Sequence, residues 1–132
     1  MALPAPIYCD QDDFEDYVEG WETTDPDGLD RLLYRAQMDV NRLLIGIPDR
    51  DTGLRVNPAR LSVYQANELA NAVCAQAEYR NAMGEDFFRR NEPRSIQGPD
   101  FSKQGRSGYY GDKVFAHLRD AGLLPRTSFL MS

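Results

Sequence analysis

The sequence predicts a mainly α-helical protein, a small bundle built on two long antiparallel helices. Apolar side chains recur at helical spacing in two long stretches, residues 26–44 and 58–83. Each stretch opens with a proline that follows Asp25 or Asn57, a pattern typical of helix starts. A chain of 132 residues also fits the size of one domain. We therefore expect a single domain over residues 1–132 with one modest core.

The N-terminal region predicts an extended arm over residues 1–9, then the start of a helical domain spanning residues 10–124. Asp10 is a suitable N-cap for a short helix reaching about Val18, because carboxylates are favoured at the positive end of a helix. Gly20 is expected to end this helix. Its apolar side is formed by Phe14, Tyr17, Val18 and Trp21.

The second helix has the clearest start, with Asp25 as cap and Pro26 at the first helical position. One continuous apolar stripe follows it, formed by Leu29, Leu32, Leu33, Ala36, Val40, Leu43 and Leu44. The connection over residues 45–57 contains Asp49, Asp51 and Gly53, which superficially resemble a calcium loop. The glycine is one position early and no bidentate Glu follows, so no metal site is predicted.

The third helix is predicted over residues 58–83, ending at Gly84. It has a face of small side chains, which permits close helix approach: Ala59, Val63, Ala66, Ala70, Val73 and Ala77. The predicted seam between the two long helices comprises Leu29, Leu32, Leu33, Ala36, Val40, Leu43, Ala66, Leu69, Ala70 and Val73.

The region after Gly84 has no helical period, and residues 95–103 predict a short irregular segment or β-hairpin around Gly98-Pro99. Asp112 is expected to cap a last helix from Lys113 to Ala121, which Gly122 ends. An extended tail over residues 125–132 completes the chain. Five apolar residues near this end are hypothesised to bind a partner: Leu123, Leu124, Phe129, Leu130 and Met131.

Charge is distributed unevenly along the chain, whose net charge is −6. Ten acids and no Lys or Arg lie between Asp10 and Asp30, so the rest of the chain is net positive. This polarity fits either a solvated acidic face or a head-to-tail contact between copies. The hypothetical subunit interface pairs acidic with basic residues: Asp12, Asp13, Asp16 and Glu19 with Arg89, Arg90, Arg94 and Arg106.

Cys9 and Cys74 have no metal-binding or redox spacing, so both are expected to be free thiols, Cys74 in a helix and Cys9 in a flexible arm. No apolar run approaches the roughly 20 residues of a membrane helix, and the N-terminus lacks the features of a secretory signal. We expect no membrane association and a reducing compartment.

No catalytic, cofactor-binding or metal-binding residues are predicted, and the chain is not expected to be an enzyme. The single histidine, His117, lies in a short helix without a nucleophile signature and is interpreted as structural or surface-exposed. The glycines at 105, 108 and 111 lack the Lys-Thr or strand-then-helix setting of a phosphate loop.

Taken together, the order of elements resembles the head-tail connector adaptor family of tailed bacteriophages. The resemblance rests on DPDGLDRLLYRAQMDVNRLL, on AVCAQAEYRNAMGED, on the irregular segment that follows, and on DKVFAHLRDAGLL. It covers about residues 10–124 as a pattern rather than a strict motif.

That resemblance implies a non-enzymatic homo-oligomeric ring, typically of twelve copies, located in the neck of the virion after assembly in the host cytoplasm. The ring would bind the portal protein on one side and a stopper or tail-completion protein on the other. DNA would pass through its channel without specific binding, and an acidic lumen would prevent it from adhering.

The alternative function is nucleic-acid binding by residues 87–110. There, basic residues alternate with aromatic ones, an arrangement that can neutralise phosphates while bases stack. The basic residues are Arg89, Arg90, Arg94, Lys103 and Arg106, and the aromatic ones are Phe87, Phe88, Phe101, Tyr109 and Tyr110. The sequence pI near 4.7 argues against this function.

Overall fold

The computed structural model describes residues 8–84, 88 and 109–124, and within them the chain is mainly helical with no strand. The predicted fold class is therefore confirmed. The elements are α1 (Gln11–Tyr17), α2 (Pro26–Asn41), the short 3₁₀ turn η1 (Pro58–Arg60), α3 (Val63–Met83) and α6 (Asp112–Ala121). The predicted hairpin at 95–103 and the tail at 125–132 lie outside the described residues.

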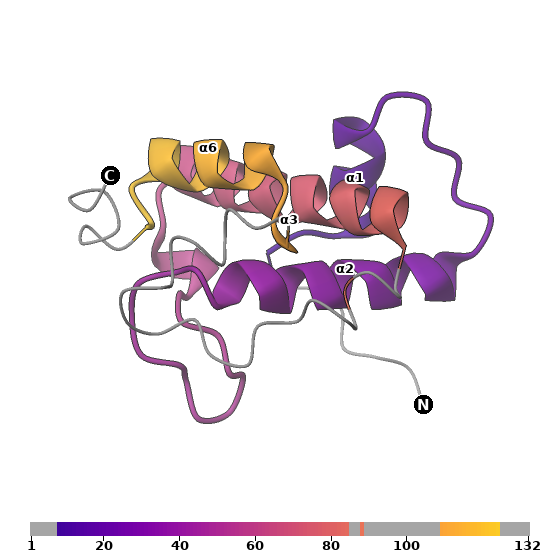
Figure 1. The fold of residues 1–132 in the computed structure, drawn as a ribbon. Coiled ribbons are helices and arrows are strands. Elements are labelled where there is room, and N and C mark those ends of the chain that lie inside the picture. The colour runs from indigo at the N-terminus through magenta and orange to yellow at the C-terminus, as the bar shows by residue number, and fades with distance from the viewer. Residues whose placement is uncertain (1–7, 85–87, 89–108, 125–132) are drawn as a thin grey trace.

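Helix α3 is the centre of the bundle, because α1, α2 and α6 all pack against it. Figure 1 shows α2 and α3 running in opposite directions, with α6 beside α3. Every residue from Ala72 to Ala77 is buried, so the middle of α3 has no solvent-facing side. The alanines there let three neighbouring helices approach closely.

The first two helices begin where the sequence predicts. The Asp10 carboxylate accepts a hydrogen bond from Asp13 N at 2.8 Å, and the Asp13 carboxylate accepts one from Asp10 N, completing a capping box. Asp25 caps α2 by accepting from Gly28 N at 3.0 Å, with Pro26 at the first helical position. Helix α1 gives way to extended backbone at Val18, two residues before Gly20.

The predicted start of the third helix is wrong. Asn57 and Pro58 open only the three-residue turn η1, and α3 begins five residues later at Val63. Ser62 is its N-cap, with the Ser62 hydroxyl accepting from Gln65 N at 3.1 Å and Gln65 Oε1 accepting from Ser62 N at 3.2 Å. This reciprocal pair satisfies two backbone donors at once, which a lone Asn-Pro start cannot do.

The predicted seam between α2 and α3 is largely confirmed. Most of its members are buried, namely Leu29, Leu33, Ala36, Val40, Leu43, Leu69 and Val73, while Leu32 and Ala70 are partly buried against them. The predicted small-residue face fails at its N-terminal end. Ala59 is exposed and the Val63 side chain is 79% exposed, because the first turn of α3 lies at the end of the bundle.

The last helix begins one residue earlier than predicted. Asp112 belongs to α6, and Gly111 occupies the N-cap position without a side-chain cap. Gly122 ends α6 as predicted, with a left-handed φ of 72° that glycine adopts without steric cost.

Candidate functional site

A buried polar network joins α2, α3 and the approach to α6. Asp39 on α2 accepts two hydrogen bonds from Arg80 on α3, from Nε at 2.6 Å and from Nη2 at 3.1 Å. Gln76 Nε2 and the Tyr109 hydroxyl also donate to Asp39, at 3.0 and 3.2 Å. The bidentate geometry and the additional donors compensate for burying both charges.

Gln76 extends this network to the backbone that precedes α6. Its side-chain nitrogen donates to Tyr109 O at 3.1 Å, and its side-chain oxygen accepts from Gly111 N at 3.1 Å. Gly111 is buried, and a Cβ there would lie 3.3 Å from Tyr79. The network therefore fixes where the chain enters α6. Sequence periodicity does not predict this network, because its members come from elements far apart along the chain.

Aromatic rings surround this network and form a series of edge-to-face contacts. Successive ring centroids lie 5.0 to 5.8 Å apart along Tyr79, Phe88, Tyr109, Tyr110 and Phe115. The Arg80 guanidinium lies 4.3 Å from the centroid of Phe88. Burial raises the pKa of Tyr109 to about 12, with the Asp39 charge adding to the effect.

Burial of these rings counts against the nucleic-acid-binding alternative. Phe88, Tyr109 and Tyr110 are only 2 to 3% exposed, so their faces are occupied by the domain itself. Base stacking requires exposed rings. The other aromatic residues of that prediction, Phe87 and Phe101, and its basic residues lie outside the described residues.

His117 connects α6 to two other helices. Its Nδ1 lies 2.9 Å from Glu68 Oε2 on α3, and its Nε2 lies 3.1 Å from the Tyr17 hydroxyl on α1. A neutral imidazole protonated on Nδ1 satisfies both contacts, donating to Glu68 and accepting from Tyr17. A carboxylate, an imidazole and a hydroxyl in series resemble a proton relay. Because its three members lie on α3, α6 and α1, the series also holds these helices together.

The segment before α1 is not a flexible arm at residues 8 and 9, contrary to the prediction. Tyr8 N donates to Gln37 Oε1 at 2.9 Å, and the Tyr8 hydroxyl oxygen lies 3.2 Å from each of two acceptors for its single proton, Asn41 Oδ1 and Val56 O. Cys9 is 1% exposed, and its sulfur lies 2.9 Å from that of Cys74 on α3. Contact with Cys74 and burial both raise the pKa of Cys9.

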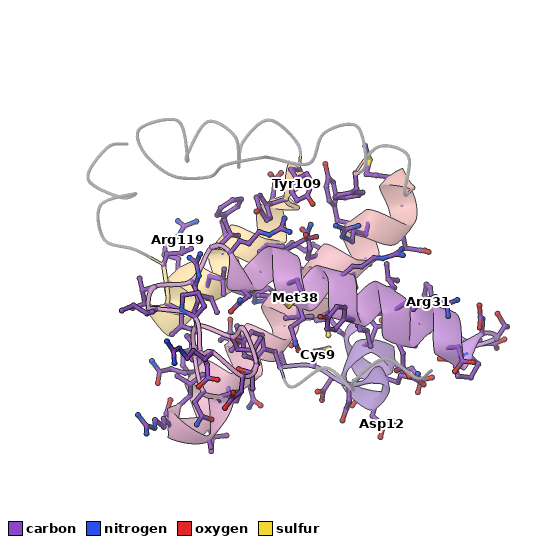
Figure 2. The ribbon with its side chains drawn as sticks, turned by 90° about the horizontal axis from the view of Figure 1, so that it is seen from below. Cys9, Asp12, Arg31, Met38, Tyr109 and Arg119 are labelled. Atoms are coloured by element: carbon purple, nitrogen blue, oxygen red, sulfur yellow. The ribbon has the colours of Figure 1, made fainter. Side chains whose placement is uncertain are left out.

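The acidic residues predicted to form a subunit contact share the outer surface of α1 and the turn after it. Asp12, Asp13, Asp16 and Glu19 are all exposed. Figure 2 shows Asp12 at the outer edge of the molecule and Cys9 near its centre. Within the described residues, none of the four takes part in an ion pair. The arginines expected to face them, at 89, 90, 94 and 106, lie outside the described residues.

A cleft of about 450 Å³ lies between the start of α2 and the end of α3. Two arginines of α2, Arg31 and Arg35, line it together with Trp21, whose indole Nε1 is buried without a hydrogen-bond partner in the described structure. Arg80 and Asn81 of α3 form the facing wall. Sequence periodicity does not predict this cleft, because its walls come from α2 and from the end of α3, which are far apart along the chain.

The end of the bundle where α2 stops and α3 starts has exposed apolar side chains. Ile45, Ile47, Val63 and Tyr64 are between 44 and 89% exposed. Ile45 N donates to Leu123 O at 3.2 Å, and Gln65 Nε2 donates to Ala121 O at 3.1 Å, so the end of α6 lies beside them. Sequence periodicity did not identify this group, because its members come from a loop and a helix start.

Leu123 and Leu124 do not lie in an exposed position for a partner. They are 5% and 8% exposed and belong to the core of the domain, because Leu123 N donates to Leu118 O and the chain folds back after Gly122. The partner-binding hypothesis therefore applies only to Phe129, Leu130 and Met131, which lie outside the described residues.

The loop that superficially resembles a calcium site is closed by its own hydrogen bonds. Asp49 Oδ1 accepts from Asp51 N at 2.7 Å and Thr52 N at 3.1 Å, and these bonds lower the pKa of Asp49. The described residues contain no cluster of three or more His, Cys, Asp or Glu side chains able to hold a metal ion. They also contain no helix long and apolar enough to cross a membrane.

Comparison with known proteins gives no further assignment. The sequence matches no protein-family model, and searches of curated proteins and of solved structures find no significant match.

Proposed function

We propose that this chain is a structural subunit of a phage neck, an adaptor that forms a ring between the portal and the stopper or tail. Its copies associate head to tail, and DNA passes through the channel that they enclose. The sequence resemblance suggests this role, and the exposed acidic surface of α1 is the structural observation that supports it. The proposed location is the virion neck, reached after assembly in the host cytoplasm.

The acidic surface supports an assembly role because its four acidic residues are exposed, where a basic partner surface can reach them. Asp12, Asp13, Asp16 and Glu19 are exposed within a stretch that contains no Lys or Arg. Like charges at such spacing repel one another, and a positively charged partner surface relieves that repulsion. Charge complementarity also steers association and fixes the register of an interface.

A second feature favours contacts at the other end of the bundle. In both figures α1 lies toward the end where α2 begins, whereas the loop between α2 and α3 lies toward the end where α2 stops. Ile45, Ile47, Val63 and Tyr64 are exposed near this second end. A subunit with an acidic surface at one end and apolar side chains at the other has two different surfaces, as head-to-tail association requires.

The test is co-expression with the portal protein of the same virus, followed by mass measurement of the purified complex. We expect the wild-type chain to co-purify with the portal as a ring. The Asp12→Lys, Asp16→Lys double variant should lose ring formation and remain folded. The matched control, Asp51→Lys with Asp120→Lys, changes net charge equally at exposed positions elsewhere and should assemble normally. Absence of any portal complex with the wild-type chain would refute the proposal.

The apolar tail provides a separate test of the partner hypothesis. Deleting residues 125–132 leaves Leu123 and Leu124 in the core, so the domain should keep its thermal midpoint. Capture by the portal or by the next neck protein should weaken, because Phe129, Leu130 and Met131 are removed. Undiminished co-purification with both partners would exclude a docking role for the tail.

A further inference from the structure

Two cysteines that are 65 positions apart in the sequence meet inside the bundle. Cys9 precedes α1 and Cys74 lies in the middle of α3, and their sulfur atoms are 2.9 Å apart with both residues buried. A disulfide bond is about 2.04 Å long, so the sulfurs need to approach by only about 0.9 Å. Both are free thiols in this structure.

The backbone holds the two residues together independently of the sulfur contact. On one side of Cys9, Tyr8 is bound to α2 through Gln37 and Asn41. On the other side, Asp10 is fixed by the capping box of α1. Cys74 belongs to the most buried part of α3. The pair is therefore positioned by three elements before any covalent bond exists.

We propose that Cys9 and Cys74 are a disulfide-forming pair that locks the N-terminal segment and α1 onto α3 when the chain passes from reducing to oxidising surroundings. The inference rests on the position of the two thiols and is independent of the proposed function. It makes this pair a site of reversible covalent modification.

The reaction is a thiol–disulfide exchange with a small disulfide such as oxidised glutathione. One cysteine thiolate attacks the glutathione S–S bond, which breaks and releases one glutathione molecule as its thiol. The second cysteine then attacks the mixed disulfide, forming the Cys9–Cys74 bond and releasing the second glutathione. The protein loses two protons and two electrons, and oxidised glutathione gains them.

The closed structure protects the reduced form. Both sulfurs are buried, so glutathione cannot reach them while the Tyr8–Asp10 segment is docked. The raised pKa of Cys9 also keeps its thiol protonated, and only the thiolate is nucleophilic. Oxidation therefore requires the N-terminal segment to open, after which closing brings the sulfurs together. The cross-link then joins the two ends of a loop that contains α1 and α2.

The experiment incubates the full reduced chain with oxidised glutathione, then denatures it and alkylates the remaining thiols. We expect a monomer with no alkylated cysteine, whose mass is lower than that of the reduced chain by two hydrogens. The thermal midpoint should rise by about 10 °C, because the cross-link restricts the unfolded chain. Adding a reductant should reverse both changes.

Variants separate the intramolecular bond from other oxidation products. Cys9→Ser and Cys74→Ser should each lose the oxidation-dependent rise in thermal midpoint. Two alkylatable thiols after oxidation, a stable glutathione adduct, or a disulfide-linked dimer of the wild-type chain would each overturn the proposal. Because the wild-type measurement is decisive by itself, the outcome stands even if a serine variant fails to fold.

Discussion

The Arg80 guanidinium donates to the Asp39 carboxylate at 2.6 and 3.1 Å, and both side chains are buried in the interior of the bundle. This pair joins the two long helices inside the bundle, where Gln76 and Tyr109 donate further hydrogen bonds to Asp39. The pair contributes to stability only while both charges are present, because either charge alone would lie buried without its counter-ion.

Removing one member of the pair should therefore be more damaging than removing both. Arg80→Met should lower the free energy of unfolding by about 3 kcal/mol, since the Asp39 charge loses its bidentate partner. Asp39→Asn combined with Arg80→Met should recover part of that loss. Urea unfolding of the single and double variants measures this coupling. Equal or additive losses would show that the pair is not a coupled unit.

Charge introduced into the core should prevent folding. Leu33→Asp and Val73→Asp should each cost several kcal/mol, about 4 kcal/mol or more, because both positions are fully buried and offer no partner for a carboxylate. The matched control is Val63→Asp in the same helix, where the side chain is 79% exposed and the carboxylate lies near a helix N-terminus. In thermal unfolding, the control variant should have the same midpoint as the parent. A parent-like melt of Val73→Asp would contradict the helix packing.

The start of α3 predicts an asymmetry between two caps. Ser62→Ala should cost about 1 kcal/mol, because Gln65 N loses its acceptor at the head of a helix of 21 residues. Asn57 caps only the three-residue turn η1, so Asn57→Ala should cost a few tenths of that amount. Chemical denaturation of both variants provides the comparison. A larger loss from Asn57→Ala would place the helix start at Pro58 instead.

Stability should fall as the pH rises above 10. Burial raises the pKa of Tyr8 to about 12, although its bond to Val56 and the Arg55 charge act in the opposite direction. An unfolded tyrosine ionises near pH 10, so between about pH 10 and 12 the unfolded chain releases this proton while the folded chain retains it. From pH 9 to 11, Tyr8 should account for about 1 kcal/mol of lost stability.

The comparison variant for this pH dependence is Tyr8→Phe. It should be less stable at pH 9, because the hydroxyl contacts with Asn41 and Val56 are gone. It should nevertheless lose less stability between pH 9 and 11 than the parent does. Parallel urea titrations at both pH values measure the difference. An identical loss in parent and variant would assign the effect to other groups.

Local signals in the sequence were sufficient for most helix boundaries. Asp10, Asp25 and Gly122 lie within one helical turn of the ends that they cap, so local sequence patterns predict all three. The sequence predicts the wrong start for the third helix because Asn57-Pro58 is itself a helix-start signal, although Ser62 and Gln65 have the spacing of a capping box. Two helix-start signals lie five residues apart, and α3 begins at the capping box of Ser62 and Gln65.

Contacts between distant segments could not be read from periodicity. The sequence predicts Cys9 in a flexible arm and Leu123 at a partner-binding end, because local patterns do not show which distant residues cover them. Both are buried by residues of α3 and its neighbours. Likewise Asp39, Gln76 and Arg80 look like ordinary polar positions of surface helices, and only the packing of α2 against α3 places them inside.

The central position of α3 also has a consequence for biosynthesis. Val114 and Leu118 of α6 cover α3, and they follow it along the chain, so they leave the ribosome after it. Until α6 has also left the ribosome, α3 retains an apolar side that only α6 can cover. Such a partly covered intermediate is prone to self-association. Chaperones should therefore engage α3 in the interval after it leaves the ribosome and before α6 docks on it.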